Sequence, residues 1–226
     1  MEGIRISGFA DEISSDFDQQ LSTVTRLGMS YISLRSANGK NVADYTPEEV
    51  EKDLLPRLKA AGVGVSSLGS LIGKIDIEDE DAFQDQLGKL ERLCMTCKLL
   101  DCRYIRVFSF YIPEGQDPEQ YRDKVIDRLK AFEAIARKYE VVLIQENEKD
   151  LYGETAGRAL TILKTVDSSY LRAAFDYANF VQCGEDTVRA WEKLREYVVI
   201  SILKTPCPAA MRTWSAVPAR GASPSF

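Results

Sequence analysis

The sequence predicts an α/β fold of the (β/α)8 TIM-barrel type that is incomplete, because its last strand–helix unit is missing. Short β-like runs alternate with longer amphipathic segments up to residue 203, which gives about seven strands and six helices. Such alternation forces parallel strands joined by right-handed crossovers. No Gly-x-Gly-x-x-Gly follows the first strand, which argues against a dinucleotide-binding sheet. A repeat of roughly 30 residues suits a barrel. A complete barrel typically needs ~250 residues, and this chain has 226.

The order of the elements follows from hydrophobic periodicity. Short apolar runs rich in β-branched residues indicate strands, and apolar positions three and four apart indicate helices. The predicted strands are 3–9, 31–34, 63–68, 104–108, 141–144, 171–175 and 197–203, and the predicted helices between them are about 16–27, 46–61, 80–100, 117–139, 154–166 and 185–196.

Local signals set the boundaries in the first half of the chain. Gly28 ends the first helix. Thr46 is an N-cap that is followed by proline and two acids, and Pro56 should disturb the middle of the helix that Thr46 opens. The third helix presents an apolar face that includes Cys94 and Cys97. We interpret this C-x-x-C pair as part of a buried helix face, because a redox motif would open a helix and a zinc site would need a second ligand pair.

The second half is bounded in the same way. Asp117 and Pro118 open the fourth helix as N-cap and first helical residue. The fifth and sixth strands are apolar runs that end in acidic residues. In the sixth helix Trp191 and Leu194 face inward at helical spacing, and the apolar run of the seventh strand begins at Tyr197.

Composition excludes several function classes. The chain contains no histidine, which excludes Ser-His-Asp and Cys-His nucleophiles and removes the commonest nitrogen ligand of metals. The net charge of −6, with acids and bases interspersed, argues against a nucleic-acid partner. No apolar stretch approaches the ~18 residues of a membrane span, and no signal sequence is visible. Five scattered cysteines are most simply free thiols, so we expect a cytoplasmic protein with no membrane partner.

Two carboxylates stand where predicted strands end. Glu146 follows the fifth strand after Gln145, and Asp176 directly follows the sixth. Because α/β folds gather their chemistry at the carboxyl ends of parallel strands, the two acids could share a divalent-cation site. Such a site usually requires imidazole or further carboxylate to be complete. The alternative is that each acid only caps the helix that follows its strand.

Several other polar side chains are expected at the same mouth of the barrel. Arg106 interrupts the apolar fourth strand, and Arg35 follows the second strand. Each could bind substrate oxygens or phosphate, or form a structural ion pair. Lys204, at the end of the seventh strand, is a candidate substrate-binding cation, and Glu12 and Asn179 are further candidates for substrate binding.

The composition changes after Lys204. Residues 205–226 hold four of the eight prolines, no Asp or Glu, and neither strand nor helix periodicity. One interpretation is a disordered extension. The other, which we favour, is a reading-frame shift: Thr-Pro-Cys can be encoded ACG-CCG-TGC, and restoring one lost G gives GAC-GCC-GTG, Asp-Ala-Val. We therefore expect one barrel domain over 1–204 and an irregular or out-of-frame tail over 205–226. Sequencing the gene across the Lys204 codon distinguishes the two interpretations.

Residues 1–204 resemble the xylose isomerase-like TIM barrels, the sugar phosphate isomerase/epimerase family. Beyond the order of strands and helices, three segments carry the resemblance, and they follow the first strand or lie on the fifth and sixth: Gly8-Phe9-Ala10-Asp11-Glu12, Leu143-Ile144-Gln145-Glu146-Asn147 and Phe175-Asp176-Tyr177-Ala178-Asn179. A back-translation of the tail in the restored frame gives Gly-Thr-Gly-Glu-Gly-Arg-Ile-Pro, which is similar to the family's continuation.

The resemblance implies a divalent metal, such as Mn, Mg, Co or Zn, held by a Glu after strand five, an Asp after strand six, a His at strand seven and a Glu after strand eight. Glu146 and Asp176 match the first two ligands, and Glu146 would also be catalytic, as half of an acid/base pair. The family's strand seven commonly reads His-Ile-Lys-Asp, but here the text is Ile202-Leu203-Lys204-Thr205. The strand-eight Glu has no counterpart.

The implied function is aldose–ketose isomerisation or epimerisation of a sugar or sugar phosphate. We expect a weakly bound metal and impaired activity in this chain, because two of the four ligands are absent. The competing hypothesis is a non-catalytic binding or interaction module on the same barrel. The expected partner is a small sugar or polyol, and the exposed edges of strands one and seven could lead to self-association.

Overall fold

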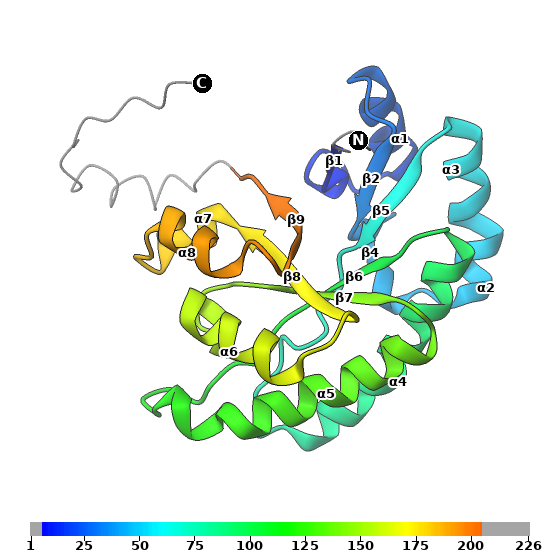
Figure 1. The fold of residues 1–226 in the computed structure, drawn as a ribbon. Coiled ribbons are helices and arrows are strands. Elements are labelled where there is room, and N and C mark those ends of the chain that lie inside the picture. The colour runs from blue at the N-terminus through cyan, green and yellow to red at the C-terminus, as the bar shows by residue number, and fades with distance from the viewer. Residues whose placement is uncertain (1–5, 205–226) are drawn as a thin grey trace, which may run out of the picture.

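The computed structural model describes residues 6–204, so the predictions for residues 1–5 and for 205–226, including the frame shift, lie outside the described residues. One seven-stranded sheet has the order β1-β2-β5-β6-β7-β8-β9 and curves into an open, TIM-barrel-like half-barrel, with the helices on its outer side (Figure 1). Every pairing in this sheet is parallel. Its strands are β1 (Ser7–Gly8), β2 (Tyr31–Leu34), β5 (Gly64–Leu68), β6 (Tyr104–Val107), β7 (Val142–Glu146), β8 (Leu171–Asp176) and β9 (Val198–Ile202).

The helices alternate with these strands, as the sequence predicts. A small antiparallel hairpin, β3 (Ser36–Ala37) with β4 (Lys40–Asn41), follows β2. Short 3-10 turns lie at Ala10–Glu12, Val42–Asp44, Pro118–Tyr121 and Tyr152–Glu154. The helices are α1 (Phe17–Arg26), α2 (Pro47–Glu49), a π-helical segment (Val50–Leu54), α3 (Leu55–Ala61), α4 (Glu80–Leu99), α5 (Arg122–Lys138), α6 (Ala156–Val166), α7 (Tyr177–Gln182) and α8 (Thr187–Leu194).

Capping residues start the helices where the sequence predicts them. Thr46 accepts a hydrogen bond from the Glu49 backbone, and the Glu49 carboxylate accepts one from the Thr46 N–H, which completes a capping box. The disturbance predicted for Pro56 is the π-helical segment just before it. A proline lacks the N–H that an α-helix would use at this point. In the π-helical segment each hydrogen bond spans one residue more than in an α-helix.

The short helix α7 was not predicted. It begins directly after β8, because the Asp176 side chain accepts a hydrogen bond from the Asn179 N–H at 3.0 Å and so caps it. At six residues, α7 is too short to show helical periodicity in the sequence. The predicted helix at 185–196 corresponds to α8.

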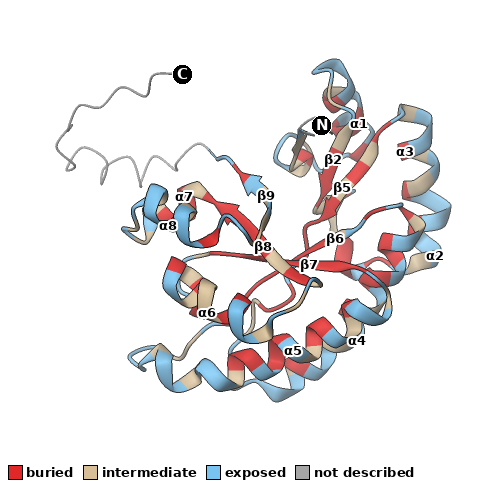
Figure 2. Cartoon of the chain, viewed as in Figure 1, coloured by how far each residue is buried: buried red, intermediate tan, exposed pale blue. Residues whose placement is uncertain are grey.

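The main hydrophobic core lies between the sheet and the surrounding helices, and a small second cluster lies inside the barrel (Figure 2). Cys94 and Cys97 are fully buried in the main core, in agreement with the interpretation of the C-x-x-C pair. Every residue of β7 is buried. The central strands are therefore covered on both faces, as parallel strands require. The inner cluster comprises Val142, Ile144, Ala174 and Ile202.

The two edges of the sheet differ from its centre. Within residues 6–204, β1 pairs only with β2, and β9 pairs only with β8. Large apolar side chains are exposed along or beside these edges, with exposed fractions of 70% for Ile6, 39% for Val199 and 82% for Leu203. No helix in this part of the chain is long and apolar enough to cross a membrane.

Candidate functional site

Three neighbouring strands bring the candidate site together at their carboxyl ends. Glu146 is the last residue of β7, and Asp176 is the last residue of β8. Asp176 is paired in register with Ile202 of β9. Side chains on a strand alternate between faces, so Lys204, two residues beyond Ile202, continues along the same face toward the two carboxylates.

Lys204 bridges the two acids. Its Nζ lies 2.5 Å from Asp176 Oδ2 and 3.3 Å from Glu146 Oε1. Arg106 reaches Glu146 from β6, with its Nη1 3.1 Å from Oε2. Two carboxylates and two cations thus form one ion cluster whose formal charges cancel. The sequence suggested each of these four residues separately, and the structure brings them into contact.

Two asparagines fix the carboxylates in place. Asn147 accepts a hydrogen bond from the Asp176 N–H at 2.9 Å and donates one to the Asp176 carbonyl at 3.1 Å. Asn179 donates to the Asn147 carbonyl at 2.8 Å and to Glu146 Oε1 at 3.3 Å. Sequence reasoning assigned no role to Asn147, although an amide directly after the strand-end Glu146 was a usable signal. Asn179, expected to bind substrate, here positions the two acids.

The carboxylates are the most buried part of the cluster. Glu146 and Asp176 are both 0% exposed, whereas the side chain of Lys204 keeps 37% of its surface. Burial raises the pKa of the Asp176 carboxyl, and the Lys204 ammonium and the Asn179 N–H offset only part of this effect. Burial alone would lower the pKa of Lys204, but Glu146 and Asp176 outweigh it and raise that pKa. Lys204 is therefore a cation at neutral pH.

Arg106 is both an ion-pair partner and part of an aromatic contact. Its guanidinium lies 5.1 Å from the ring centre of Phe9 and 5.0 Å from that of Phe108. It also donates from Nη2 to the Ser70 carbonyl. Its Nε is buried without a hydrogen-bond partner within the described chain. Of the two interpretations offered by the sequence, the ion pair is present.

Arg35 and Glu12 lie apart from the ion cluster. Arg35 donates to Asp11 at 2.6 Å and to Glu12 at 3.3 Å, at the end of the sheet near β1. Its guanidinium packs 4.9 Å from the Phe9 ring centre. Phe9 therefore stands within contact of both Arg35 and Arg106, and it is the link between this ion pair and the cluster around Glu146.

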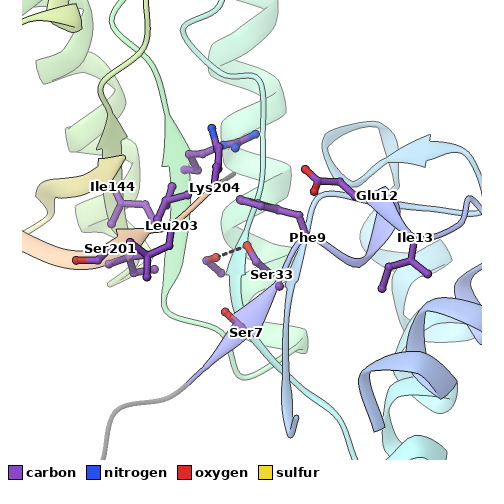
Figure 3. Close-up of a pocket in the computed structure, with 14 residues that line it drawn as sticks. Ser7, Phe9, Glu12, Ile13, Ser33, Ile144, Ser201, Leu203 and Lys204 are labelled. Carbon is purple, nitrogen blue, oxygen red and sulfur yellow. Dashed lines mark hydrogen bonds between the residues drawn. The ribbon is translucent and has the colours of Figure 1, made fainter. Parts of the chain in front are cut away.

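A cavity of about 570 Å³ opens between β1 and β9 (Figure 3). Phe9, just after β1, and Lys204, just after β9, both line it. Arg106 and Lys204 line it, but Glu146 and Asp176 do not, so the two cations separate the carboxylates from the cavity. Its remaining lining is mixed, with hydroxyl groups and a carboxylate beside an apolar wall: Ser7, Gly8, Glu12, Ile13, Ser33, Ser67, Ile144, Ile200, Ser201, Ile202 and Leu203. Sequence reasoning did not single out Ser33 and Ser67, which are buried and line this cavity.

The donor set does not fit a divalent metal. Within residues 6–204 no group of three or more His, Cys, Asp or Glu side chains could hold one. The two carboxylates that could serve as ligands are already neutralised by Lys204 and Arg106. A divalent ion at this position would have to displace the Lys204 ammonium and would gain only two carboxylate ligands.

Known proteins share this fold. The chain is 20% identical over 171 residues to 3-dehydroshikimate dehydratase from Bacillus anthracis, an alignment that covers 76% of this chain and 60% of that protein. The chain therefore spans about 60% of the length of this curated relative. A xylose isomerase-like TIM barrel protein from Mycobacterium smegmatis in complex with magnesium superposes with a TM-score of 0.72 at 17% identity, over 88% of this chain and 74% of that one. A D-tagatose 3-epimerase-like protein superposes with a TM-score of 0.71 at 16% identity, over 88% and 74%.

The solved structures have low identity to this chain and show the fold alone. The family model described as xylose isomerase-like TIM barrel matches residues 21–205, which is most of the chain. Proteins of this family include epimerase-like and dehydratase relatives, and at least one solved relative holds magnesium. On the match over residues 21–205, the chain belongs to the xylose isomerase-like TIM barrel family.

Proposed function

We propose that this chain binds a small sugar-like or polyol ligand in the cavity between β1 and β9, and that it is impaired as a metal-dependent sugar isomerase or epimerase. The observation that carries the proposal is the position of Lys204. Its ammonium lies between the Glu146 and Asp176 carboxylates and the cavity, where the family resemblance would place a divalent ion.

The cavity suits a polyhydroxylated ligand. Its volume of about 570 Å³ lies within the ~300–1,000 Å³ range of small-molecule sites. Ser33 and Ser67 share a hydrogen bond of 2.7 Å, and both line the cavity, so each can exchange this bond for one to a ligand hydroxyl. The Phe9 ring offers an apolar surface for the C–H face of a sugar. Lys204, which lines the cavity, can donate to ligand oxygens.

The arrangement of these residues favours ligand binding in the cavity over proton transfer by Glu146. A carboxylate that moves a proton must reach the reacting carbon directly or through one water. Glu146 is 0% exposed and its two oxygens are held by Arg106, Lys204 and Asn179. Proton transfer by Glu146 therefore requires that Lys204 first moves away. The free thiols of the described cysteines fit a reducing compartment, and we propose that the protein functions in the cytoplasm.

The rival function, weak metal-dependent isomerisation, rests on one observation, that Glu146 and Asp176 share the same Nζ and so lie close enough to bind one cation. Two measurements separate the two functions. The first is titration calorimetry of the full chain with xylitol and D-fructose, with and without Mn²⁺. The second is exchange of substrate C–H protons in D₂O, with Mn²⁺ or Mg²⁺, followed by NMR.

Binding that saturates, that does not change with Mn²⁺ and that weakens several-fold in Ser33→Ala supports the proposed function. The matched control is Ser22→Ala, whose hydroxyl bonds the Gln19 carbonyl on the exposed surface of α1, and it should bind as the unmodified chain does. Proton exchange that depends on added metal and is lost in Glu146→Gln would establish the rival function instead. Absence of binding to either probe, with a correctly folded chain, contradicts the proposal.

A further inference from the structure

Three cysteines gather where α4 meets β6, on the side of the molecule that the proposed ligand cavity does not use. Cys94 and Cys97 lie on α4, and Cys102 follows the turn that ends this helix. Their side chains are 0%, 0% and 7% exposed. The Sγ atoms of Cys97 and Cys102 both contact the Tyr104 carbonyl oxygen, at 4.0 and 3.6 Å. The two thiols therefore converge on a single acceptor.

The turn itself holds Cys97 and Cys102 together. Asp101 adopts a positive φ of 49°, the Cys102 N–H donates to the Cys97 carbonyl at 2.9 Å, and the Asp101 N–H donates to the Lys98 carbonyl at 3.4 Å. This is the Schellman pattern, in which the third helical residue from the end contacts the second residue after the cap. The two cysteines occupy the positions that usually hold a hydrophobic contact.

The backbone hydrogen bond also sets an upper limit on the separation of the two Cα atoms. The amide nitrogen lies about 1.5 Å from its own Cα, and the carbonyl oxygen about 2.4 Å from its Cα. With the N···O distance of 2.9 Å, the Cα atoms cannot be more than about 6.8 Å apart, which is within the range of about 4.4–6.8 Å that disulfides use. The backbone therefore does not hold Cys97 and Cys102 too far apart for a disulfide.

From this geometry we propose that Cys97 and Cys102 are a redox-sensitive pair, which a peroxide converts into an intramolecular disulfide that ties the end of α4 to the start of β6. The two thiols have different roles. The hydrogen bond from the Cys97 thiol lowers the pKa of Cys102 below its ordinary value of 9.0, whereas burial raises the pKa of Cys97 well above it. Cys102 is the more exposed of the two and is the nucleophile.

The reaction is balanced with hydrogen peroxide as the oxidant. The Cys102 thiolate attacks one peroxide oxygen, the O–O bond breaks, and hydroxide leaves and takes up the proton that the Cys102 thiol released. The Cys97 sulfur then attacks the Cys102 sulfenic acid, the S–S bond forms, and the leaving hydroxide takes the Cys97 proton. Two thiols and one peroxide give one disulfide and two waters. A small oxidant suits a sulfur with 7% exposure, and a shallow cavity of about 290 Å³ borders the turn at Leu99, Leu100 and Asp101.

Tryptic mapping detects a disulfide between Cys102 and the end of α4, because Lys98 lies between Cys97 and Cys102. Cleavage after Arg92, Lys98 and Arg103 gives peptide 93–98, which contains Cys94 and Cys97, and peptide 99–103, which contains Cys102. The reduced full chain is treated with hydrogen peroxide, blocked at its remaining thiols and digested without reductant. We expect the free thiols to fall from the five of the sequence by two, and the two peptides to be joined until dithiothreitol is added.

Variants assign the partner of Cys102. The linked peptides should persist in the control variants Cys94→Ser and Cys183→Ser, and should be absent in Cys97→Ser and in Cys102→Ser. A disulfide contained within peptide 93–98 overturns the proposal. So does a link that persists in Cys97→Ser, or oxidation of Cys102 to sulfinic acid with no link. Fragmentation of the linked peptides from the unmodified chain in the mass spectrometer also places the bridge on Cys94 or on Cys97, so a variant that fails to fold does not prevent a decision.

Discussion

The ion cluster contains Glu146 at the end of β7 and Lys204 just beyond β9, and the two strands differ in burial. Every residue of β7 is buried, and its last residue, Glu146, is 0% exposed. In β9 partly buried and exposed positions alternate up to Ile202, the one buried residue of this strand, and Lys204 just beyond it keeps 37% of its side-chain surface. The Glu146 carboxylate is thus fixed in the centre of the sheet, and the Lys204 ammonium reaches it from the edge. Glu146 cannot change without loss of stability, whereas Lys204 is the part of the cluster that can be replaced.

The largest expected effect is that of Glu146→Gln. Loss of this charge leaves Arg106 buried without its ion-pair partner, at a cost of about 3–5 kcal/mol in the free energy of unfolding. The matched control is Glu148→Gln, because Glu148 pairs with Lys74 at 2.6 Å but is partly exposed, and its loss should cost less than about 1 kcal/mol. Urea denaturation of both variants measures the difference. If Glu146→Gln and Glu148→Gln lower the free energy of unfolding equally, burial at the end of β7 does not make Glu146 more important to stability.

The next largest effect should come from Gly73→Ala, a test of how rigid the loop between β5 and α4 is. Gly73 has a φ of 86°, and a Cβ there would lie 2.1 Å from the Phe108 carbonyl oxygen. The Gly73 carbonyl also accepts a hydrogen bond from the Phe110 N–H, so the loop cannot move away without losing this bond. We expect a cost of about 2–3 kcal/mol.

Gly39→Ala is the control for backbone strain alone. Gly39, in the hairpin of β3 and β4, has a similar φ of 74°, but nothing lies within 4 Å of an added Cβ. This variant should lose about 1 kcal/mol, as measured by the same urea titration. If it loses as much as Gly73→Ala, the contact with Phe108 is not the cause.

A smaller effect is expected for Lys204→Met, at the edge. This variant removes the ion pairs with Asp176 and Glu146 but leaves the Arg106–Glu146 pair, and exposure reduces the cost to about 1 kcal/mol. The pKa of Lys204 is raised in the folded state above its ordinary value of 10.5, so folding holds this proton more tightly. The unmodified chain should therefore have a higher free energy of unfolding than Lys204→Met. This difference is fully present below pH 10.5 and is lost as the pH rises through the folded-state pKa of Lys204.

Unfolding titrations of both proteins from pH 7 to 11 measure this dependence. We expect the difference in free energy of unfolding between the two proteins to be constant up to about pH 10 and smaller above it. A difference that grows with pH would show that Lys204 does not stabilise the carboxylates as the ammonium.

The smallest effect on stability, and the clearest on assembly, should come from Val199→Lys. Val199 is 39% exposed on β9, which has only one strand neighbour in the described chain. A lysine on an edge strand opposes pairing with another chain. We expect the unmodified chain to self-associate at micromolar concentration, and the variant to do so less, with a change in stability under about 0.5 kcal/mol.

Sedimentation velocity measures this association. Val188→Lys is the control, because Val188 is 66% exposed on the helix α8 and not on an edge strand, and it should leave association unchanged. An unmodified chain that sediments as a monomer at all concentrations would contradict the expectation of self-association through the sheet edges.

The barrel-type fold could be predicted from the sequence, because the alternation of short apolar runs with amphipathic segments is a local property. The family was indicated by resemblance, through the segments that follow the first strand or lie on the fifth and sixth. The predicted strand at 31–34 matches β2, and Thr46 caps its helix as expected. The helix α7 was missed because it is short and its start depends on the Asp176 side chain. Sequence reasoning offered a cap and a cation site as alternatives for Asp176, but one carboxylate oxygen caps α7 and the other pairs with Lys204.

The sequence by itself determined which chemical groups are available: two acids at strand ends, no histidine, and one lysine beyond the last strand. Only the tertiary structure decided what these groups do to one another. Lys204 meets Glu146 across 58 residues of chain, through the register of β8 with β9 and the alternation of side chains along a strand. Contacts of this kind depend on distances of a few ångströms between remote residues, and no local pattern in the sequence encodes them. The tertiary structure therefore places an ammonium where family resemblance alone predicted a metal.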